Sequence, residues 1–167
     1  MYKSGECVIY SCNGVCRVLE TVTQQRNGET SEYLVLEPIE QPGARYFVPT
    51  ANPLAMGKLR PIMSKEQLQD LLSSDTVKED GWISDENQRR QVYRELINGG
   101  DRAALIRMIC ALYRHKQTQL AAGRKFHQAD ENLLRDAQKL INTEFALILE
   151  ISPQKVGEYI LSAMDAE

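Results

Sequence analysis

The chain has 167 residues, of which 43% are hydrophobic and 26% are charged, and its net charge is −3. This composition is typical of a globular protein and excludes a disordered chain, and no apolar run reaches the length of about eighteen residues that a membrane span needs. The N-terminus lacks the apolar core of a signal peptide. We therefore expect a cytoplasmic protein with reduced cysteines.

The first part of the chain is expected to form strands. Short segments rich in Val, Tyr, Ile and Thr alternate with turn signals, which include two Asn-Gly pairs, and this pattern indicates a small Tudor- or SH3-like antiparallel β-barrel. The four predicted strands cover residues 7–12, 15–24, 33–39 and 45–50.

From Ser64 onward the pattern becomes helical. Ser64 and Gln67 have the spacing of a capping box, Asp101 can cap a long helix, and Ser152-Pro153 can begin the last one. The predicted helices cover 65–74, 86–97 with a stop at Asn98-Gly99-Gly100, 102–121, 130–150, and the segment that starts at Pro153. The expected fold class is therefore α+β, with a β domain at 1–60 and an all-helical domain at 61–167.

Charge is distributed unevenly along the helical part. Residues 87–127 carry nine Lys and Arg against two acidic side chains, whereas residues 128–167 carry three basic and eight acidic ones. Arg107 and Arg114 are seven residues apart, so they share nearly one azimuth about 10 Å apart along a helix. Such cations could follow a phosphate backbone, or they could form a solvated helix face paired with the acidic flanks.

The cysteines give little support to a metal site or to an enzyme. Cys7, Cys12 and Cys16 cross a predicted hairpin, but zinc takes four ligands and usually a C-x2–4-C knuckle. A fourth ligand would come from elsewhere in the chain: Cys110, His115 or His127. The alternative is that the cysteines are small core and turn residues. No P-loop, Rossmann, G-x-S-x-G or H-E-x-x-H motif occurs, so we expect no catalytic residue, metal or cofactor.

The only tryptophan, Trp82, lies between an acidic turn and the basic block. The ring could be buried as a plug beneath a loop, which is common for tryptophan. It could also be an exposed wedge or stacking platform beside a cationic surface, suited to a base step or an unpaired base. Its position after Asp80-Gly81 and before a helix start favours a loop tip.

Five segments together resemble the CarD/CdnL family of bacterial transcription factors, whose N-terminal module is shared with the transcription-repair coupling factor. The segments are YKSGECVIYSCNGVCRV, EYLVLEP, FVPTANPLAMGKLRPIMSKEQL, GWISDENQRRQVYRELINGGD and LLRDAQKLINTEFAL, in this order. The resemblance implies a non-enzymatic, cytoplasmic regulator that binds the β subunit of RNA polymerase through its N-terminal module. It implies that the helical domain contacts promoter DNA at the upstream edge of the bubble and stabilises the open complex, with no membrane or small-molecule partner.

The resemblance also assigns site residues. Trp82 matches the family's wedge tryptophan, and the basic residues expected to hold phosphates are Arg89, Arg90, Arg94, Arg107, Arg114, Arg124 and Lys125. The two family arginines that contact polymerase align with Gln24 and Phe47, whereas Arg26 and Arg45 lie two residues away, on the same strand faces. The competing interpretation is a protein–protein adaptor that makes no direct DNA contact.

Overall fold

The computed structural model describes residues 2–99 and 101–165, and the chain divides into two compact units, Met1–Ile62 and Met63–Glu167. We refer to them as the β unit and the helical unit. The first holds an antiparallel sheet and the second is helical, so the predicted α+β class is confirmed. Gly100, expected in a helix stop, lies outside the described residues.

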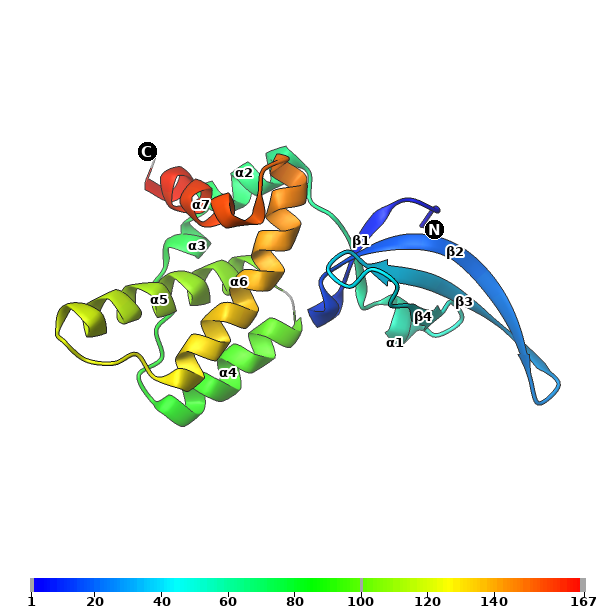
Figure 1. Ribbon diagram of the computed structural model, residues 1–167, viewed down its shortest axis with the longest axis horizontal. Coiled ribbons are helices and arrows are strands. Elements are labelled where there is room, and N and C mark those ends of the chain that lie inside the picture. Colours follow the sequence, from blue (N-terminus) through cyan, green and yellow to red (C-terminus); the bar gives the residue numbers. More distant parts are fainter. Residues whose placement is uncertain (1, 100, 166–167) are drawn as a thin grey trace. The chain divides into compact units, whose positions relative to one another are not determined.

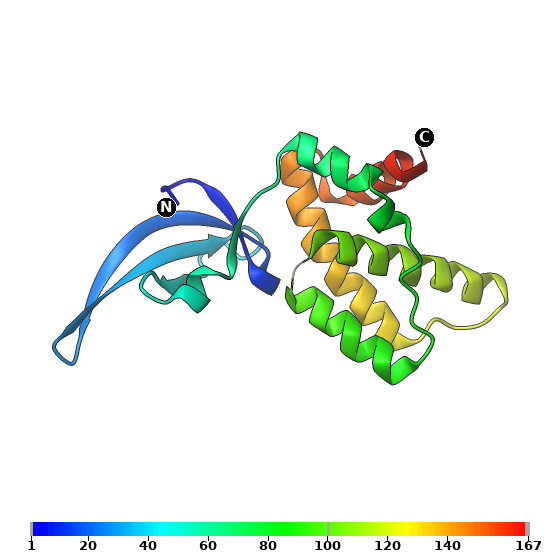
Figure 2. The same ribbon diagram turned by 180° about the vertical axis from the view of Figure 1, so that it is seen from behind.

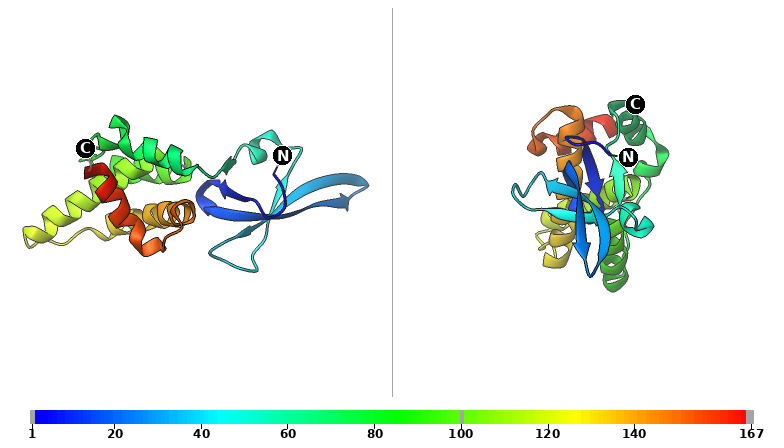
Figure 3. Two further views of the ribbon diagram at one scale, coloured as in Figure 1. Left: turned by 90° about the horizontal axis from the view of Figure 1, so that it is seen from above. Right: turned by 90° about the vertical axis from the view of Figure 1, so that its right-hand side faces the viewer.

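The β unit is built on one curved antiparallel sheet (Figures 1 and 3). Its strands, in the spatial order β4-β3-β2-β1-β5, are β1 (Cys7–Tyr10), β2 (Val15–Arg26), β3 (Glu29–Pro38), β4 (Tyr46–Pro49) and β5 (Leu59–Pro61). The small barrel expected from the sequence thus takes the form of a sheet whose edges are β4 and β5. The three-residue β5 and the short helix α1 (Pro53–Met56) were not predicted, because such short elements carry almost no periodic signal.

The long β2–β3 hairpin owes its turn to Asn27 and Gly28, which have φ of 53° and 80°. Two consecutive positive φ values match the right-handed twist of the flanking strands, which is why Asn-Gly is favoured there. Alternate residues of the strands form a buried core on one face of the sheet. Its members are Val8, Cys16, Val18, Leu34, Leu36, Val48 and Leu59.

The helical unit begins at a capping box in which Ser64 and Gln67 exchange side-chain and backbone hydrogen bonds, as predicted. Asp101 likewise caps its helix by accepting from the Ala104 N–H. The helices are α2 (Lys65–Ser73), α3 (Asp75–Lys78), α4 (Glu86–Gly99), α5 (Arg102–Ala121), α6 (Gln128–Leu149), the 3-10 turn η2 (Pro153–Lys155) and α7 (Val156–Asp165). Only α3 was missed among the α-helices of this unit.

The central helix α6 packs against α4 and α5, and α7 packs against α2 (Figure 2). Their shared core includes Tyr93, Leu105, Leu112, Ile141 and Phe145, each at most 1% exposed. A nearly buried ion pair between Arg102 and Glu144 adds a polar link between the start of α5 and α6. Within the described ranges, none of the helices has both the length and the apolar character of a membrane span.

Candidate functional site

The Trp82 loop, defined as residues 79–85, joins α3 to α4 in the helical unit. The indole is half-buried and stacks on the imidazole of His115 in α5, with ring centroids 3.9 Å apart and an interplanar angle of 18°. Its surroundings therefore combine the two alternatives that the sequence left open. The ring rests on the helical core, yet part of it stays accessible to solvent.

Arg89 is the second group against the indole, with its guanidinium carbon 4.4 Å from the ring centroid. The same guanidinium donates to both carboxylate oxygens of Asp130 at 3.0 and 2.9 Å and to the Ile83 carbonyl at 3.0 Å. Only 5% of Arg89 is exposed, in contrast to its expected place among the phosphate-binding cations. Its charge is neutralised internally, so its role here is to position the Trp82 loop.

Two further contacts fasten the loop on either side of the indole. The Tyr93 hydroxyl donates to the Gly81 carbonyl at 2.6 Å, and the backbone N–H of Trp82 donates to the Asp80 carboxylate at 3.0 Å. Burial raises the pKa of Tyr93 to about 12, so its hydroxyl keeps its proton. A Cβ at Gly81 would lie 3.2 Å from the backbone oxygen of Arg107, which explains why the loop has glycine where it crosses α5.

His115 supplies the other support of the indole. Burial is the main reason that its pKa lies below the usual 6.5; the positive charge of Arg89 adds to the shift and Asp130 opposes it. The imidazole is accordingly neutral at neutral pH and stacks as an uncharged aromatic ring. Phe126, in the segment that follows α5, also contacts His115, and the two ring centroids are 6.2 Å apart.

The other predicted cations are exposed except Arg107, which is half-buried, and three of them make ion pairs. Arg90 pairs with Glu86, Arg94 with Asp136 at 2.9 Å, and Arg107 with Glu79 at 3.0 Å. Exposed pairs of this kind contribute about 0–1 kcal/mol, so each can exchange its carboxylate for another anion.

The remaining three predicted cations make no ion pair with a described residue. Arg114 is exposed and hydrogen-bonds to Cys110, while Arg124 and Lys125 lie exposed between α5 and α6. The starts of α4 and α6, joined by the Arg89–Asp130 pair, lie side by side, and the segment with Arg124 and Lys125 leads into α6 (Figure 1). Arg90 lies in α4, directly after the Trp82 loop, and Arg107 pairs with Glu79 of the loop itself.

In the β unit, the predicted polymerase residues share the face of the sheet opposite its core. Phe47 pairs in register with Val35, which lies between the core residues Leu34 and Leu36 and so points to the other face. Phe47 is 50% exposed and makes an edge-to-face contact with Tyr33 at 6.5 Å between centroids.

The polar members of this set flank Phe47 on that face. Arg45 donates to Glu37 at 2.6 Å, and the pKa of Glu37 is lowered mainly by the hydrogen bond from the Gly43 N–H and then by the one from Arg45. Gln24 and Arg26 are exposed near the end of the β2–β3 hairpin, in register with Ser31 and Glu29.

The cysteines are not assembled into a metal site by the described residues. Burial raises the pKa of Cys16 to about 11, which makes it a protonated core residue, and the pKa of Cys110 is raised for the same reason. No group of three or more His, Cys, Asp and Glu that could hold a metal occurs in the part of the chain that the structure describes. The side chain of Cys12 lies outside that part.

Several residues that build the site carry no signal in the sequence. His115 was considered only as a zinc ligand, and Asp130, Tyr93 and Gly81 were given no role at the site. Each becomes important through a contact with a residue far away in the chain, as in the pair of Arg89 and Asp130. The one clue in the sequence for Asp130 was its position at the start of a predicted helix.

The β unit matches a known domain family. Residues 2–63 match the family model described as the CarD-like/TRCF RID domain, which confirms the resemblance for this part of the chain. The match covers the β unit and leaves the helical unit unmatched. No curated protein matches the chain. The β unit is therefore similar to CarD-like/TRCF RID domains over almost all of its length.

We predict that Gly81→Ala destabilises the helical unit by about 1–3 kcal/mol, because backbone atoms of α5 cannot yield to the new methyl group. Thermal unfolding and acrylamide quenching of Trp82 would measure the effect, with lower stability and a more accessible indole expected. Gly99→Ala is the matched control, since a Cβ there meets no atom within 4 Å. Equal stability of the two variants would contradict the proposed close packing.

Proposed function

We propose, taking the CarD-like/TRCF RID domain of residues 2–63 as the premise, that this protein is a non-enzymatic bacterial transcription regulator. Its β unit binds the β subunit of RNA polymerase. Its helical unit contacts promoter DNA at the upstream edge of the transcription bubble, where Trp82 stabilises the open complex. The family match is the observation that carries the proposal, because this domain class serves as a polymerase-interacting module.

The polymerase contact is assigned to the Phe47 face and the adjoining edge of the sheet. Strand β4 pairs with β3 on one side only, so its second side offers backbone groups for pairing with a strand of the partner. Phe47 supplies an exposed aromatic anchor next to that edge, and Arg45 adds a cation beside it. Gln24 and Arg26 extend the same face along the hairpin.

The DNA contact of Trp82 is supported by the energetics of its present surroundings. Stacking on His115 contributes about 0.5–1.5 kcal/mol and the Arg89 contact about 0.5–2 kcal/mol. Stacking of an aromatic side chain on a base contributes about 1–3 kcal/mol. The exchange of His115 for an unstacked base is therefore nearly balanced, and a modest preference for melted DNA suffices to drive it.

Phosphate contacts supply the remaining preference. Among the predicted cations, Arg114, Arg124 and Lys125 are exposed and make no ion pair with a described residue, and Arg90 and Arg94 can exchange their surface partners. Cations of this kind bind DNA by releasing counterions, which makes the contact sensitive to salt. Arg89 is left out of this set because phosphate could reach it only by displacing Asp130.

The second candidate function is a protein–protein adaptor, and the ion pairs of the basic block favour it. Arg89, Arg94, Arg107 and Lys116 all pair with carboxylates of the helical unit itself. A surface neutralised in this way attracts DNA less than its sequence charge indicates. Footprinting of polymerase with forked promoter DNA distinguishes the two functions, because only the regulator adds protection upstream of the bubble.

We predict that Trp82→Ala shortens the lifetime of the promoter open complex by at least ~5-fold, the equivalent of about 1 kcal/mol of lost stacking. Binding of the variant to polymerase should be unchanged, because the substitution lies in the helical unit. Trp82→Phe is the matched control and should retain much of the effect, since phenylalanine also stacks. An unchanged lifetime with Trp82→Ala would contradict the wedge.

We predict that Phe47→Asp weakens binding to RNA polymerase by ~10-fold or more, because a central aromatic anchor is lost and a carboxylate is desolvated. Affinity can be measured with the core enzyme by biolayer interferometry. Leu54→Asp is the control, since Leu54 in α1 is 83% exposed and lies outside the Phe47 face. The assignment fails if both variants bind like the wild type, or if both lose binding equally.

A further inference from the structure

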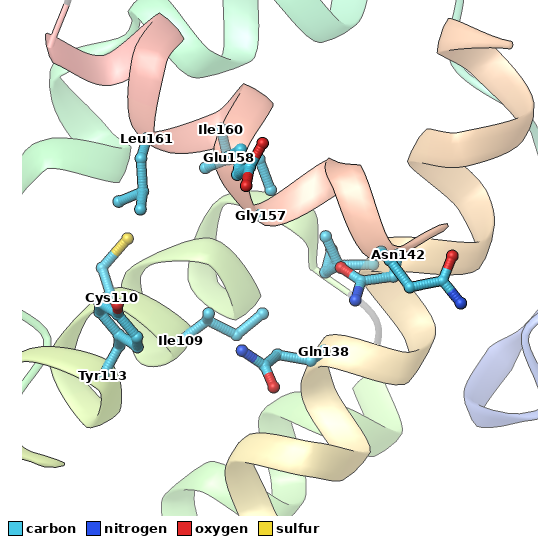
Figure 4. Close-up of a pocket in the computed structure, with 11 residues that line it drawn as sticks. Ile109, Cys110, Tyr113, Gln138, Asn142, Gly157, Glu158, Ile160 and Leu161 are labelled. Atoms are coloured by element: carbon cyan, nitrogen blue, oxygen red, sulfur yellow. The ribbon is translucent and has the colours of Figure 1, made fainter. Parts of the chain in front are cut away.

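The helical unit contains a cavity that the proposed function does not use. It has a volume of about 310 Å³ and lies between α5, α6 and α7 (Figure 4). Ile109, Ile141 and Ile160, one from each helix, supply apolar walls. Leu161 reaches from α7 toward Cys110, and both belong to the lining. A volume at the lower end of the usual range for binding pockets suits one or two inserted side chains.

Gly157, the second residue of α7, leaves one wall of this cavity open. A helical glycine costs about 0.5–1 kcal/mol relative to alanine, so its presence calls for a reason. Its φ is not in the positive range and a Cβ would meet no atom within 4 Å, so neither backbone conformation nor close packing requires it. The one structural consequence of the missing side chain is the open space that belongs to the cavity.

The lining of the cavity also includes polar groups. Gln138 and Asn142 lie half-buried on α6, and no buried nitrogen or oxygen of either amide is left without a hydrogen-bond partner. Gln138 reaches toward Ile109 across the cavity (Figure 4). Glu158 is the one charged residue of the lining, and it is exposed. A ligand with an apolar body and a positively charged group would complement this lining.

The rim of the cavity indicates a larger occupant than a small molecule. Tyr113 and Leu161 are 38% and 44% exposed at the rim, and Leu120 on α5 is 58% exposed. Tyr113 and Leu120 are seven residues apart, so they share nearly one azimuth about 10 Å apart along the helix. A small molecule in the cavity would leave Leu120 in water, whereas a helix of two or three turns laid along α5 would cover the whole strip.

This surface is separate from the Trp82 loop. On α5, Tyr113 and His115 differ by two positions and therefore by about 200° in azimuth. Tyr113 lines the cavity, whereas His115 holds the indole of Trp82. The two surfaces lie on opposite sides of α5, so both can be occupied at the same time.

We propose that the cavity between α5, α6 and α7 is the anchor pocket of a protein-docking surface that binds a basic amphipathic helix. An apolar side chain of that helix enters between the three isoleucines. A lysine or arginine one turn away pairs with Glu158, and the apolar face continues over Tyr113 toward Leu120. Helix-in-groove recognition of this type uses apolar anchors at i, i+3 or i+4, and i+7.

The test uses the full chain and a stapled helical peptide of leucine, alanine and lysine with the basic amphipathic pattern. Gly157→Leu adds a Cβ that meets no atom within 4 Å and extends an apolar side chain from the open wall, so it should weaken peptide binding by at least ~10-fold, as should Glu158→Lys. Gly99→Ala, a helical glycine outside the cavity, should bind like the wild type. Circular dichroism should show that all variants keep their helical content, and backbone amide shifts should change at the cavity.

Three outcomes would overturn the proposal. The first is that the basic peptide does not bind, or binds equally well to Gly157→Leu. The second is equal binding of the acidic analogue in which every lysine is replaced by glutamate. The third is concentration-dependent dimerisation of the wild type that Gly157→Leu abolishes, which would identify a second copy of this chain as the occupant. None of these outcomes bears on polymerase or DNA binding, so the proposed function is tested separately.

Discussion

The buried ion pair between Arg89 and Asp130 is the interaction on which the candidate site depends. It joins the start of α4 to the start of α6, and the same guanidinium holds the carbonyl of Ile83 and lies against the indole of Trp82. Removing one member of a buried pair costs about 3–5 kcal/mol, because the other charge is left without compensation. The position of the indole is therefore coupled to the packing of two helices, which lets a loop residue keep a defined orientation.

This coupling divides the basic block by function. Arg89 and Arg102 are nearly buried, pair with Asp130 and Glu144, and stabilise the helical unit. The exposed cations of the block hold their carboxylate partners only weakly, because surface ion pairs contribute little free energy, so they stay available to another anion. The net charge of the segment is therefore larger than the positive charge that can attract DNA. Only the cations that remain exposed at the surface contribute to that attraction.

The sequence was sufficient for the fold class, for the long helices and for the caps at Ser64 and Asp101, because periodicity and capping are local properties. It missed α1, α3 and β5, which are too short to show a period. It placed Trp82 in a loop, but the partner of the indole, His115, is remote in the chain and has no local signature. Arg89 was assigned to phosphate because charge can be read from a sequence, whereas its burial and its pair with Asp130 depend on tertiary contacts.

Arg89→Lys tests the central claim most directly, because Trp82 is the only tryptophan of the chain and reports alone on its surroundings. Lysine keeps the charge opposite Asp130 but loses the planar fork that reaches both the carboxylate and Ile83. Acrylamide quenching of Trp82 fluorescence is predicted to rise in this variant, and to stay at the wild-type value in Arg90→Lys, whose side chain is exposed. Quenching that is the same in Arg89→Lys as in the wild type would contradict the conclusion that this ion pair positions the indole.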